Sequence, residues 1–206
     1  MTTLLLVRHG ATPWTAEHRL QGRTDIDLSG SGRAEVAALA PTVATWAPRS
    51  VVVSPLARAR STAALLTATL PTAPEPVVDD RWAEHGLGDW EGLTPDEIGA
   101  DYRRWRAGEL TPPGGETAVR TRRRVAAAVR DAARHDGPVL VVTHGGIVRA
   151  ALAECLGLSA AHLVPAAAPS MTVLDVVEDA VRLRHYNLAG PGPGQALDSV
   201  SPRPPV

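Results

Sequence analysis

The chain has 206 residues, of which 44% are hydrophobic, and its formal net charge is −1. This length fits one domain with a sizeable core, and the near-neutral charge argues against a surface that binds nucleic acid. A single cysteine, Cys155, excludes an intramolecular disulfide. The N-terminus lacks the pattern of a secretory signal, and no run of roughly 18 apolar residues predicts a membrane span. We therefore expect a cytoplasmic protein that binds neither nucleic acid nor membrane.

Two short apolar runs lead into the same dipeptide, His-Gly. They are LLLVRHG, from Leu4 to Gly10, and VLVVTHGG, from Val139 to Gly146. Four apolar residues bounded by a polar turn predict a strand buried on both faces, as in a parallel sheet. Ligands bind beyond the carboxyl ends of such strands. His9 and His144 are therefore expected to meet at one edge of a single sheet.

The neighbours of the two histidines indicate what the ligand is. Arg8 adds a fixed positive charge beside His9. Gly10 and Gly145 are expected to let the backbone come close to a ligand, because glycine has no side chain. Two histidines and an arginine at strand ends predict an anion, and phosphate is the first choice.

Strand and helix signals then alternate along the chain. After a polar loop from Ala11 to Ser29, residues 31–46 show helical spacing, and Pro41 is expected to kink or divide that helix. Residues 50–53 predict a short strand. Ser54 and Pro55 follow it as a helix-start signal, an N-cap and a proline at the first helical position.

The helix that follows Ser54 is expected to face the ligand. Arg58 falls in its first turn, where the positive end of the helix dipole favours anions. Arg60 lies two residues further on and faces another way. Only one of these two arginines is therefore expected to line the pocket.

The second half of the chain completes an α/β pattern. Thr94 to Glu97 form a capping box that opens a helix, and residues 116–135 predict a long Ala/Arg-rich helix. Residues 171–177 and 181–186 predict two strands joined by a turn. The Pro/Gly-rich tail, residues 190–206, is expected to be flexible. The alternation predicts an α/β three-layer sandwich, with helices on both faces of a mostly parallel central sheet.

Phosphoryl transfer has three chemical needs that this chain can meet. A neutral imidazole is a competent nucleophile near neutral pH. Arginine supplies a fixed positive fork for the transferring group, and a carboxylic acid must protonate the leaving oxygen. The loop of residues 81–92 holds three carboxylates. Spacing alone does not choose among Glu84, Asp89 and Glu91.

Five motifs occur in the order RHGATPWTAEHRLQGRTDIDLSGSGRAE, SPLARARSTA, AEHGLGDWEGLT, PGGET and VTHGG. Together they resemble the histidine phosphatase superfamily, the phosphoglycerate mutase-like family, in its phosphatase branch. The resemblance covers roughly residues 4–150. It implies a phosphoglycerate mutase-like fold in a single domain over residues 1–189, with residues 94–113 capping the site.

The resemblance also implies a role for each catalytic residue. His9 matches the histidine that becomes phosphorylated, and Arg8, Arg58 and His144 match the rest of the phosphate pocket. Glu84 matches the proton donor.

Four further residues are expected on the substrate side. Gln21 and Gly22 match the loop that lines it, and Gly145 is expected to offer its backbone N–H to a phosphate oxygen. Thr15 stands where the family often has asparagine, so it can still donate one hydrogen bond but reaches less far. Ala11 stands where the family often has an acid.

The implied reaction is ping-pong hydrolysis of a small phosphomonoester. His9 attacks phosphorus, Glu84 protonates the leaving oxygen, and water then attacks the phosphohistidine with Glu84 as base. No metal and no cofactor are expected. Two alternatives stay open, a phosphoglycerate mutase and a non-catalytic module that binds a phosphorylated ligand. The family mutases tend to have a longer insertion after the acid loop, and an aromatic residue where this chain has Leu87.

The expected partner is a small phosphorylated metabolite, whose identity the sequence leaves open. Arg103, Arg104 and Arg106 are candidates for binding a second acidic group, although solubility explains them equally well. Trp82 and Trp105 are candidates for packing on a substrate ring, and His85, beside Glu84, for touching substrate. The sequence carries no signature of an oligomeric state.

Overall fold

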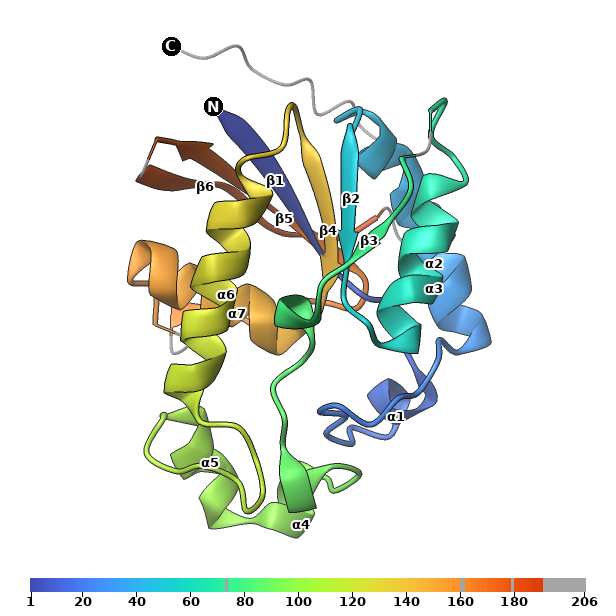
Figure 1. Ribbon diagram of the computed structural model, residues 1–206. Helices are drawn as coiled ribbons and strands as arrows, with labels where there is room; N and C mark the ends of the chain where they lie inside the picture. The colour runs from blue at the N-terminus through green and yellow to red at the C-terminus, as the bar shows by residue number, and fades with distance from the viewer. Residues whose placement is uncertain (73, 160–161, 179, 191–206) are drawn as a thin grey trace.

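A mixed sheet forms the centre of the computed structural model, which describes residues 1–72, 74–159, 162–178 and 180–190 (Figure 1). Within these ranges six strands pair in the order β3-β2-β4-β1-β5-β6. The strands are β1 (Thr2–Arg8), β2 (Ser50–Val53), β3 (Val77–Val78), β4 (Val139–Thr143), β5 (Ser170–Val177) and β6 (Ala180–Leu188). The first four strands are mutually parallel, and β5 is antiparallel to its neighbours β1 and β6. The predicted mostly parallel sheet is confirmed.

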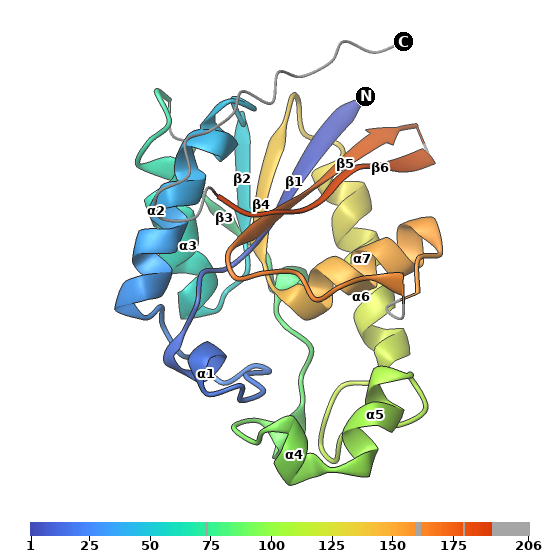
Figure 2. The ribbon, with the colours of Figure 1, turned by 180° about the vertical axis from the view of Figure 1, so that it is seen from behind.

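Helices cover both faces of this sheet, as predicted (Figures 1 and 2). One face carries α2 (Gly30–Ala44) and α3 (Ala57–Thr67), and the other carries α6 (Ala118–Ala132) and α7 (Gly145–Leu156). The shorter elements lie beyond the carboxyl ends of the parallel strands. They are α1 (Pro13–Ala16), α4 (Pro95–Ile98), α5 (Ala100–Arg106) and the 3₁₀ turns η1 (Asp80–Trp82) and η2 (Gly88–Trp90).

The apolar run of β1 joins the two halves of the core. Its side chains alternate between the sheet faces, because successive residues of a strand point in opposite directions. Leu4 and Leu6 pack with α6 and α7, whereas Leu5 and Val7 pack with α2 and α3. All four side chains are fully buried, and each stabilises the fold by about 1.5–3 kcal/mol. This burial anchors the residue that follows the strand, His9.

Two local predictions need revision. Helix α2 runs through Pro41 without being divided, although proline lacks the N–H that would bond the carbonyl of Ala37. Packing of Leu39 and Val43 into the core carries the helix through this position. Helix α3 begins at Ala57, so Ser54 is not its N-cap. The Ser54 hydroxyl instead hydrogen-bonds Nε2 of His144.

The other element predictions agree with the structure apart from small shifts at the ends. The capping box at Thr94 opens α4, and the long helix is five residues shorter than expected. The final two strands form the predicted hairpin. From residue 191 onward, the predicted flexible tail lies outside the described residues. Within the described ranges, no helix is long and apolar enough to cross a membrane.

Candidate active site

Strand register places the two His-Gly segments at one edge of the sheet. β1 and β4 are adjacent and parallel, and Arg8 pairs with Thr143. The two histidines that follow these strands therefore lie side by side at the same edge of the sheet. The backbone N–H of His9 donates to the carbonyl of Thr143 at 3.0 Å, and the centres of the two imidazole rings are 5.1 Å apart.

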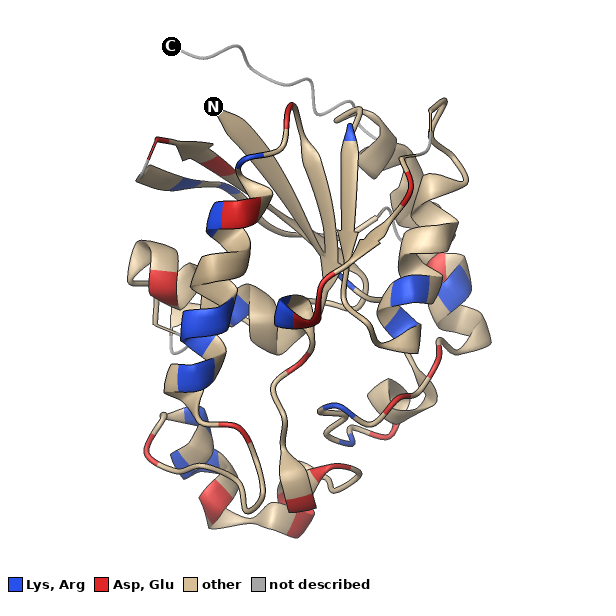
Figure 3. Ribbon diagram, viewed as in Figure 1, with Lys and Arg blue, Asp and Glu red and all other residues tan. Residues whose placement is uncertain are grey.

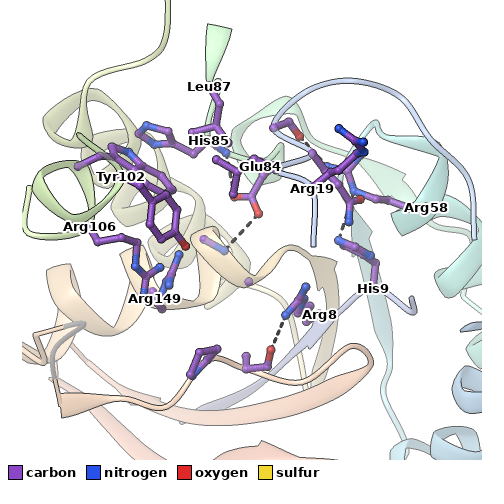
Figure 4. A pocket seen from close by; sticks show the side chains of 18 residues that line it. Arg8, His9, Arg19, Arg58, Glu84, His85, Leu87, Tyr102, Arg106 and Arg149 are labelled. Atoms are coloured by element: carbon purple, nitrogen blue, oxygen red, sulfur yellow. Dashed lines mark hydrogen bonds between the residues drawn. The ribbon is translucent and has the colours of Figure 1, made fainter. Parts of the chain in front are cut away.

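A cavity of about 240 Å³ opens above His9 (Figure 4). Most of the predicted site residues line it, namely Arg8, His9, Gln21, Gly22, Arg58, Glu84 and Gly145. Two predicted site residues do not line it. His144 is fully buried behind His9, and Thr15 lies outside the cavity.

The contacts of His9 define which of its ring nitrogens is free to react. Nδ1 lies 2.7 Å from the carbonyl oxygen of Gly10, so this nitrogen carries the proton. Nε2 accepts a hydrogen bond from Nε of Arg58 at 3.2 Å, so this nitrogen holds a lone pair. Burial, followed by the positive charges of Arg58 and Arg8, holds the pKa of His9 well below its ordinary value. His9 is therefore a neutral imidazole at physiological pH.

Arg58 is held by the substrate-side loop. Its side chain has no solvent exposure, although arginine is rarely buried. Nη1 donates to the carbonyl of Thr24 at 2.9 Å, and Nη2 donates to that of Gly22 at 2.6 Å. Burial lowers the pKa of Arg58, but a guanidinium stays charged in proteins. The result is a fixed positive charge directly beside the reactive nitrogen of His9.

Arg8 supplies the second charge at this end of the cavity. Nη1 donates to the carbonyl of Ala166, whereas the buried Nε has no partner among the described residues. A buried donor without a partner costs stability unless a ligand uses it. This N–H is therefore available to an anion bound in front of His9.

His144 does not line the cavity but packs against the ring of His9. Its Nε2 lies 2.7 Å from the hydroxyl of Ser54, which fixes the ring. Burial, reinforced by the charge of Arg58, keeps the pKa of His144 well below its ordinary value. A second neutral imidazole thus packs edge-on against the first.

Among the three carboxylates that the sequence could not separate, only Glu84 lines the cavity. Its Oε1 accepts the N–H of His85 at 2.9 Å, and its Oε2 accepts the N–H of Gly146 at 3.2 Å. A Cβ at Gly146 would lie 2.4 Å from Oε1, so only glycine allows this approach. Asp89 is exposed and outside the cavity.

Glu91 has a structural role instead. It accepts hydrogen bonds from the Thr24 hydroxyl at 2.6 Å and from the backbone N–H groups of Thr24, Arg23 and Leu87. Burial alone would raise the pKa of Glu91, but these hydrogen bonds outweigh it and lower the pKa. The carboxylate ties the substrate-side loop to the acid loop.

Thr15 supports Gln21 rather than the cavity itself. Its hydroxyl oxygen accepts from Nε2 of Gln21 at 3.1 Å and from the N–H of Thr12 at 3.0 Å. This contact orients Gln21, whose buried Oε1 has no partner within the described ranges. Thr15 does not line the cavity, because the threonine side chain is short and already used locally.

Two other residues have structural roles. A Cβ at Gly10 would lie 2.6 Å from the Val36 side chain, so packing against α2 requires this glycine. Trp82 is fully buried in the core and cannot pack on a substrate ring.

The substrate side of the cavity is built mainly from α5 and α7, and α5 carries both basic and acidic residues (Figure 3). Trp105 and Arg106 line it as expected, but Arg103 and Arg104 are exposed on α5 and do not. Residues that the sequence reasoning missed are Arg19, Tyr102 and Arg149. Only Arg149 had a usable signal, since it lies one helical turn after Gly145 on the same face.

The described part of the chain holds no group of three or more His, Cys, Asp or Glu side chains that could bind a metal ion. The cavity instead offers a neutral imidazole, two fixed guanidinium groups at its His9 end and one oriented carboxylate. This combination can bind a phosphate group, attack it and protonate what leaves.

Comparisons with known proteins point to the same chemistry. The sequence profile of the "Histidine phosphatase superfamily (branch 1)" matches residues 4–189. A glucosyl-3-phosphoglycerate phosphatase from Mycolicibacterium vanbaalenii is 37% identical over 175 residues, 75% of this chain and 74% of that protein. A 2,3-bisphosphoglycerate-dependent phosphoglycerate mutase 2 from Gloeobacter violaceus is 34% identical over 170 residues, covering 77% and 78%. The structure of mycobacterial glucosyl-3-phosphoglycerate phosphatase in complex with VO₃ superposes with a TM-score of 0.78 at 34% identity, covering 91% of this chain and 99% of that one.

Proposed function

We propose that this chain, which belongs to branch 1 of the histidine phosphatase superfamily, hydrolyses small phosphomonoesters through a phosphohistidine formed on His9. The observation that carries the proposal is the lone pair of His9 Nε2, which is buried, neutral and paired with the guanidinium of Arg58. Such a nitrogen is a nucleophile, and its partner is a ready-made contact for a phosphate oxygen.

The first half of the proposed reaction forms the intermediate. Nε2 of His9 attacks phosphorus while Arg58 moves its hydrogen bond from Nε2 to a phosphate oxygen. Nε of Arg8 and the N–H of Gly145 bind the remaining equatorial oxygens, where negative charge is concentrated. Glu84 gives its proton to the leaving oxygen.

The second half returns the enzyme to its starting state. Glu84, now a carboxylate, takes a proton from water as that water attacks phosphohistidine. The P–N bond breaks, inorganic phosphate leaves and His9 recovers its lone pair. His144, held by Ser54, supports the His9 ring through both steps.

The test is phosphate release from p-nitrophenyl phosphate and from a panel of phosphorylated metabolites that includes glucosyl-3-phosphoglycerate. Wild type and His9→Ala are compared without added metal and with EDTA present. Turnover that survives EDTA and is lost in His9→Ala supports the proposal. Equal turnover in both proteins would show that His9 is not the nucleophile.

A phosphoglycerate mutase at 34% identity is similar to this chain and keeps the mutase alternative open. Mutase activity would appear as conversion of 3-phosphoglycerate to 2-phosphoglycerate after priming with the bisphosphate. A non-catalytic phosphate-binding module would bind phosphate without any turnover. The presence of nucleophile, charges and acid around one cavity favours catalysis over a binding module. Leu87 lines the cavity where the family mutases tend to have an aromatic residue, which favours hydrolysis over the mutase.

Two further expectations from the sequence accompany this proposal. The partner is a small phosphorylated metabolite, and the expected location is the cytoplasm. Ranking the substrate panel by kcat/KM addresses the first expectation, and cell fractionation addresses the second.

A further inference from the structure

The cavity holds more positive charge than one phosphate group uses. Arg8 and Arg58 lie at the His9 end, whereas Arg106 of α5 and Arg149 of α7 point in from the side away from His9 (Figure 4). Glu84 is the one carboxylate among the residues described around this cavity. No ion pair found between described residues includes Arg106 or Arg149. The far end therefore carries two cations available for an anion.

His85 adds an unsatisfied acceptor at the same end. The residue is only 9% exposed, and its Nδ1 lies 2.7 Å from the hydroxyl oxygen of Thr121. Nε2 is buried and has no partner within the described ranges. Burial lowers the pKa of His85, so the ring is neutral at physiological pH.

Nδ1 of His85 is engaged with the Thr121 hydroxyl, so Nε2 is the ring nitrogen left for a ligand. When Nδ1 donates to the Thr121 oxygen, the lone pair lies on Nε2. This atom is therefore placed to accept a hydrogen bond from a substrate hydroxyl.

The cavity also continues beyond this end. A second cavity of about 360 Å³ shares part of its wall with the first, including His85, Trp105, Arg106 and Arg149. Further along, small side chains line it, such as Ala107, Ala118, Ala150 and Ala153. The arginines and His85 thus stand at a junction, with space behind them for more of a ligand.

We propose that His85, Arg106 and Arg149 form a leaving-group subsite that selects phosphomonoesters carrying a second acidic group and a hydroxyl. This inference rests on the proposed phosphatase function. The two arginines bind the acidic group, a carboxylate or a second phosphate, and His85 Nε2 accepts the hydroxyl. The second cavity admits substituents attached beyond these groups.

The first test compares two substrates of almost equal size, 3-phosphoglycerate and glycerol 3-phosphate. They differ in having a carboxylate or a hydroxymethyl group. Since a hydrogen bond to a charged group is worth about 1.5–3 kcal/mol, wild type is expected to favour 3-phosphoglycerate by about 10- to 100-fold in kcat/KM. The same comparison between fructose 1,6-bisphosphate and fructose 6-phosphate tests whether the subsite also favours a second phosphate.

Substitutions of the two arginines test whether the preference for 3-phosphoglycerate depends on them. Arg106→Gln and Arg149→Gln are each expected to reduce kcat/KM for 3-phosphoglycerate by about 10-fold or more, mainly through KM, and to change that for glycerol 3-phosphate about two-fold or less. Arg103→Gln is the matched control, because it removes an exposed arginine from the same helix outside both cavities. Arg149→Lys keeps the charge and is expected to restore part of the preference.

His85 is tested separately. His85→Phe keeps a ring but removes the acceptor, so it is expected to weaken both glycerol-based substrates relative to p-nitrophenyl phosphate. Thr121→Val removes the partner of Nδ1 and is expected to act in the same direction, less strongly. Circular dichroism of each variant checks that it is folded.

The outcomes separate the subsite from the phosphatase activity. Equal losses for 3-phosphoglycerate and glycerol 3-phosphate in folded Arg106→Gln and Arg149→Gln would overturn the subsite. Hydrolysis of p-nitrophenyl phosphate that still depends on His9 would meanwhile leave the proposed function intact. Absence of turnover on every substrate in wild type would overturn both.

Discussion

The two ends of the cavity are built in different ways. At the phosphate end, His9 is 3% exposed and Arg58 is fully buried, and both extend from long elements of the sandwich. At the leaving-group end, Tyr102, Trp105 and Arg106 are half-buried on α5, a helix of seven residues. One end is set by the register of buried strands, and the other by a short helix at the edge of the fold.

The short helix is held by ring contacts rather than by core burial. The ring of Trp105 lies 6.1 Å from that of Trp90 and 6.1 Å from that of His85, both outside α5. Helices this short are not stable alone, so these contacts position the cap. The comparison indicates that substitutions in α5 can alter substrate choice without disturbing the phosphate chemistry. The predictions below test that division, from the largest expected effect to the smallest.

The largest effect is expected for Glu84→Gln, at the border of the two ends. Glutamine cannot donate a proton to an alkoxide, so turnover of glycerol 3-phosphate should fall by roughly 10²–10⁴-fold. p-Nitrophenolate needs little protonation, so p-nitrophenyl phosphate should be affected much less. Steady-state kinetics on both substrates measures the difference. Equal losses of turnover on both substrates would show that Glu84 is not the proton donor.

Arg58→Gln should reduce the hydrolysis of all substrates alike. It removes a fixed charge from the transferring group, which is worth about 10²–10³-fold in rate. Its uniform effect would contrast with the selective effect of Arg106→Gln. Thermal unfolding is the control, because the carbonyls of Gly22 and Thr24 lose their donor. A loss confined to substrates with a second acidic group would contradict this prediction, because it would assign Arg58 to the leaving-group end.

Sequence reasoning was more successful at one end than at the other. His9 and His144 follow buried strands, and the carboxyl edge of a parallel sheet is where such residues converge. Glu84 lies in a loop without periodicity, so the residues alone could not separate it from Asp89 and Glu91. The difference is physical, since only Glu84 meets the N–H of Gly146 across the chain.

Other features depended on tertiary contacts that spacing does not encode. Gly10 is required by Val36 on another element, and Ser54 is used by His144 rather than by its own helix. Arg149 was accessible to helical periodicity, whereas Arg19 lies in a loop with no pattern. The sandwich could be predicted because burial is periodic in sequence, but the cavity-lining residues Arg19 and Tyr102 could not.

The pH dependence provides a further test of the phosphate end. Burial and the charges of Arg58 and Arg8 disfavour the imidazolium, so the pKa of His9 is below 6.5. In the pH profile of kcat/KM, the fall in activity caused by protonation of His9 should therefore occur below pH 6.5. Arg58→Gln removes one of these charges, which raises the pKa of His9 and moves this fall in activity to higher pH. Comparing both proteins on one substrate cancels the substrate's own ionisation near pH 6; a fall at an unchanged pH would contradict this account.

Glu116→Gln should weaken the contact between the substrate-side loop and α6, and so lower the free energy of unfolding. The Glu116 carboxylate bridges Arg23 of the substrate-side loop and Arg124 of α6. Its pKa is lowered from 4.5 to about 2, so its contribution is complete above pH 4.5 and is lost as the pH falls toward 2. Since one pKa unit corresponds to about 1.4 kcal/mol, the full lowering is worth roughly 3.5 kcal/mol, and screening by solvent reduces the expected loss at pH 7 to roughly 2–3 kcal/mol. In urea unfolding, the difference in the free energy of unfolding between wild type and Glu116→Gln should be smaller at pH 3 than at pH 7. A difference that does not change with pH would assign the loss to packing.

The smallest effect on the chemical step is expected for Trp105→Ala. The change removes the ring contacts that position α5, each worth about 0.5–1.5 kcal/mol, but touches nothing at the phosphate end. KM for 3-phosphoglycerate should therefore rise, whereas kcat for p-nitrophenyl phosphate should stay close to that of wild type. Hydrogen exchange should become faster in residues 94–113 and remain unchanged in β1 and β4. If kcat for p-nitrophenyl phosphate fell as far as it does in Arg58→Gln, the cap would be part of the catalytic geometry, and the division between the two ends would be wrong.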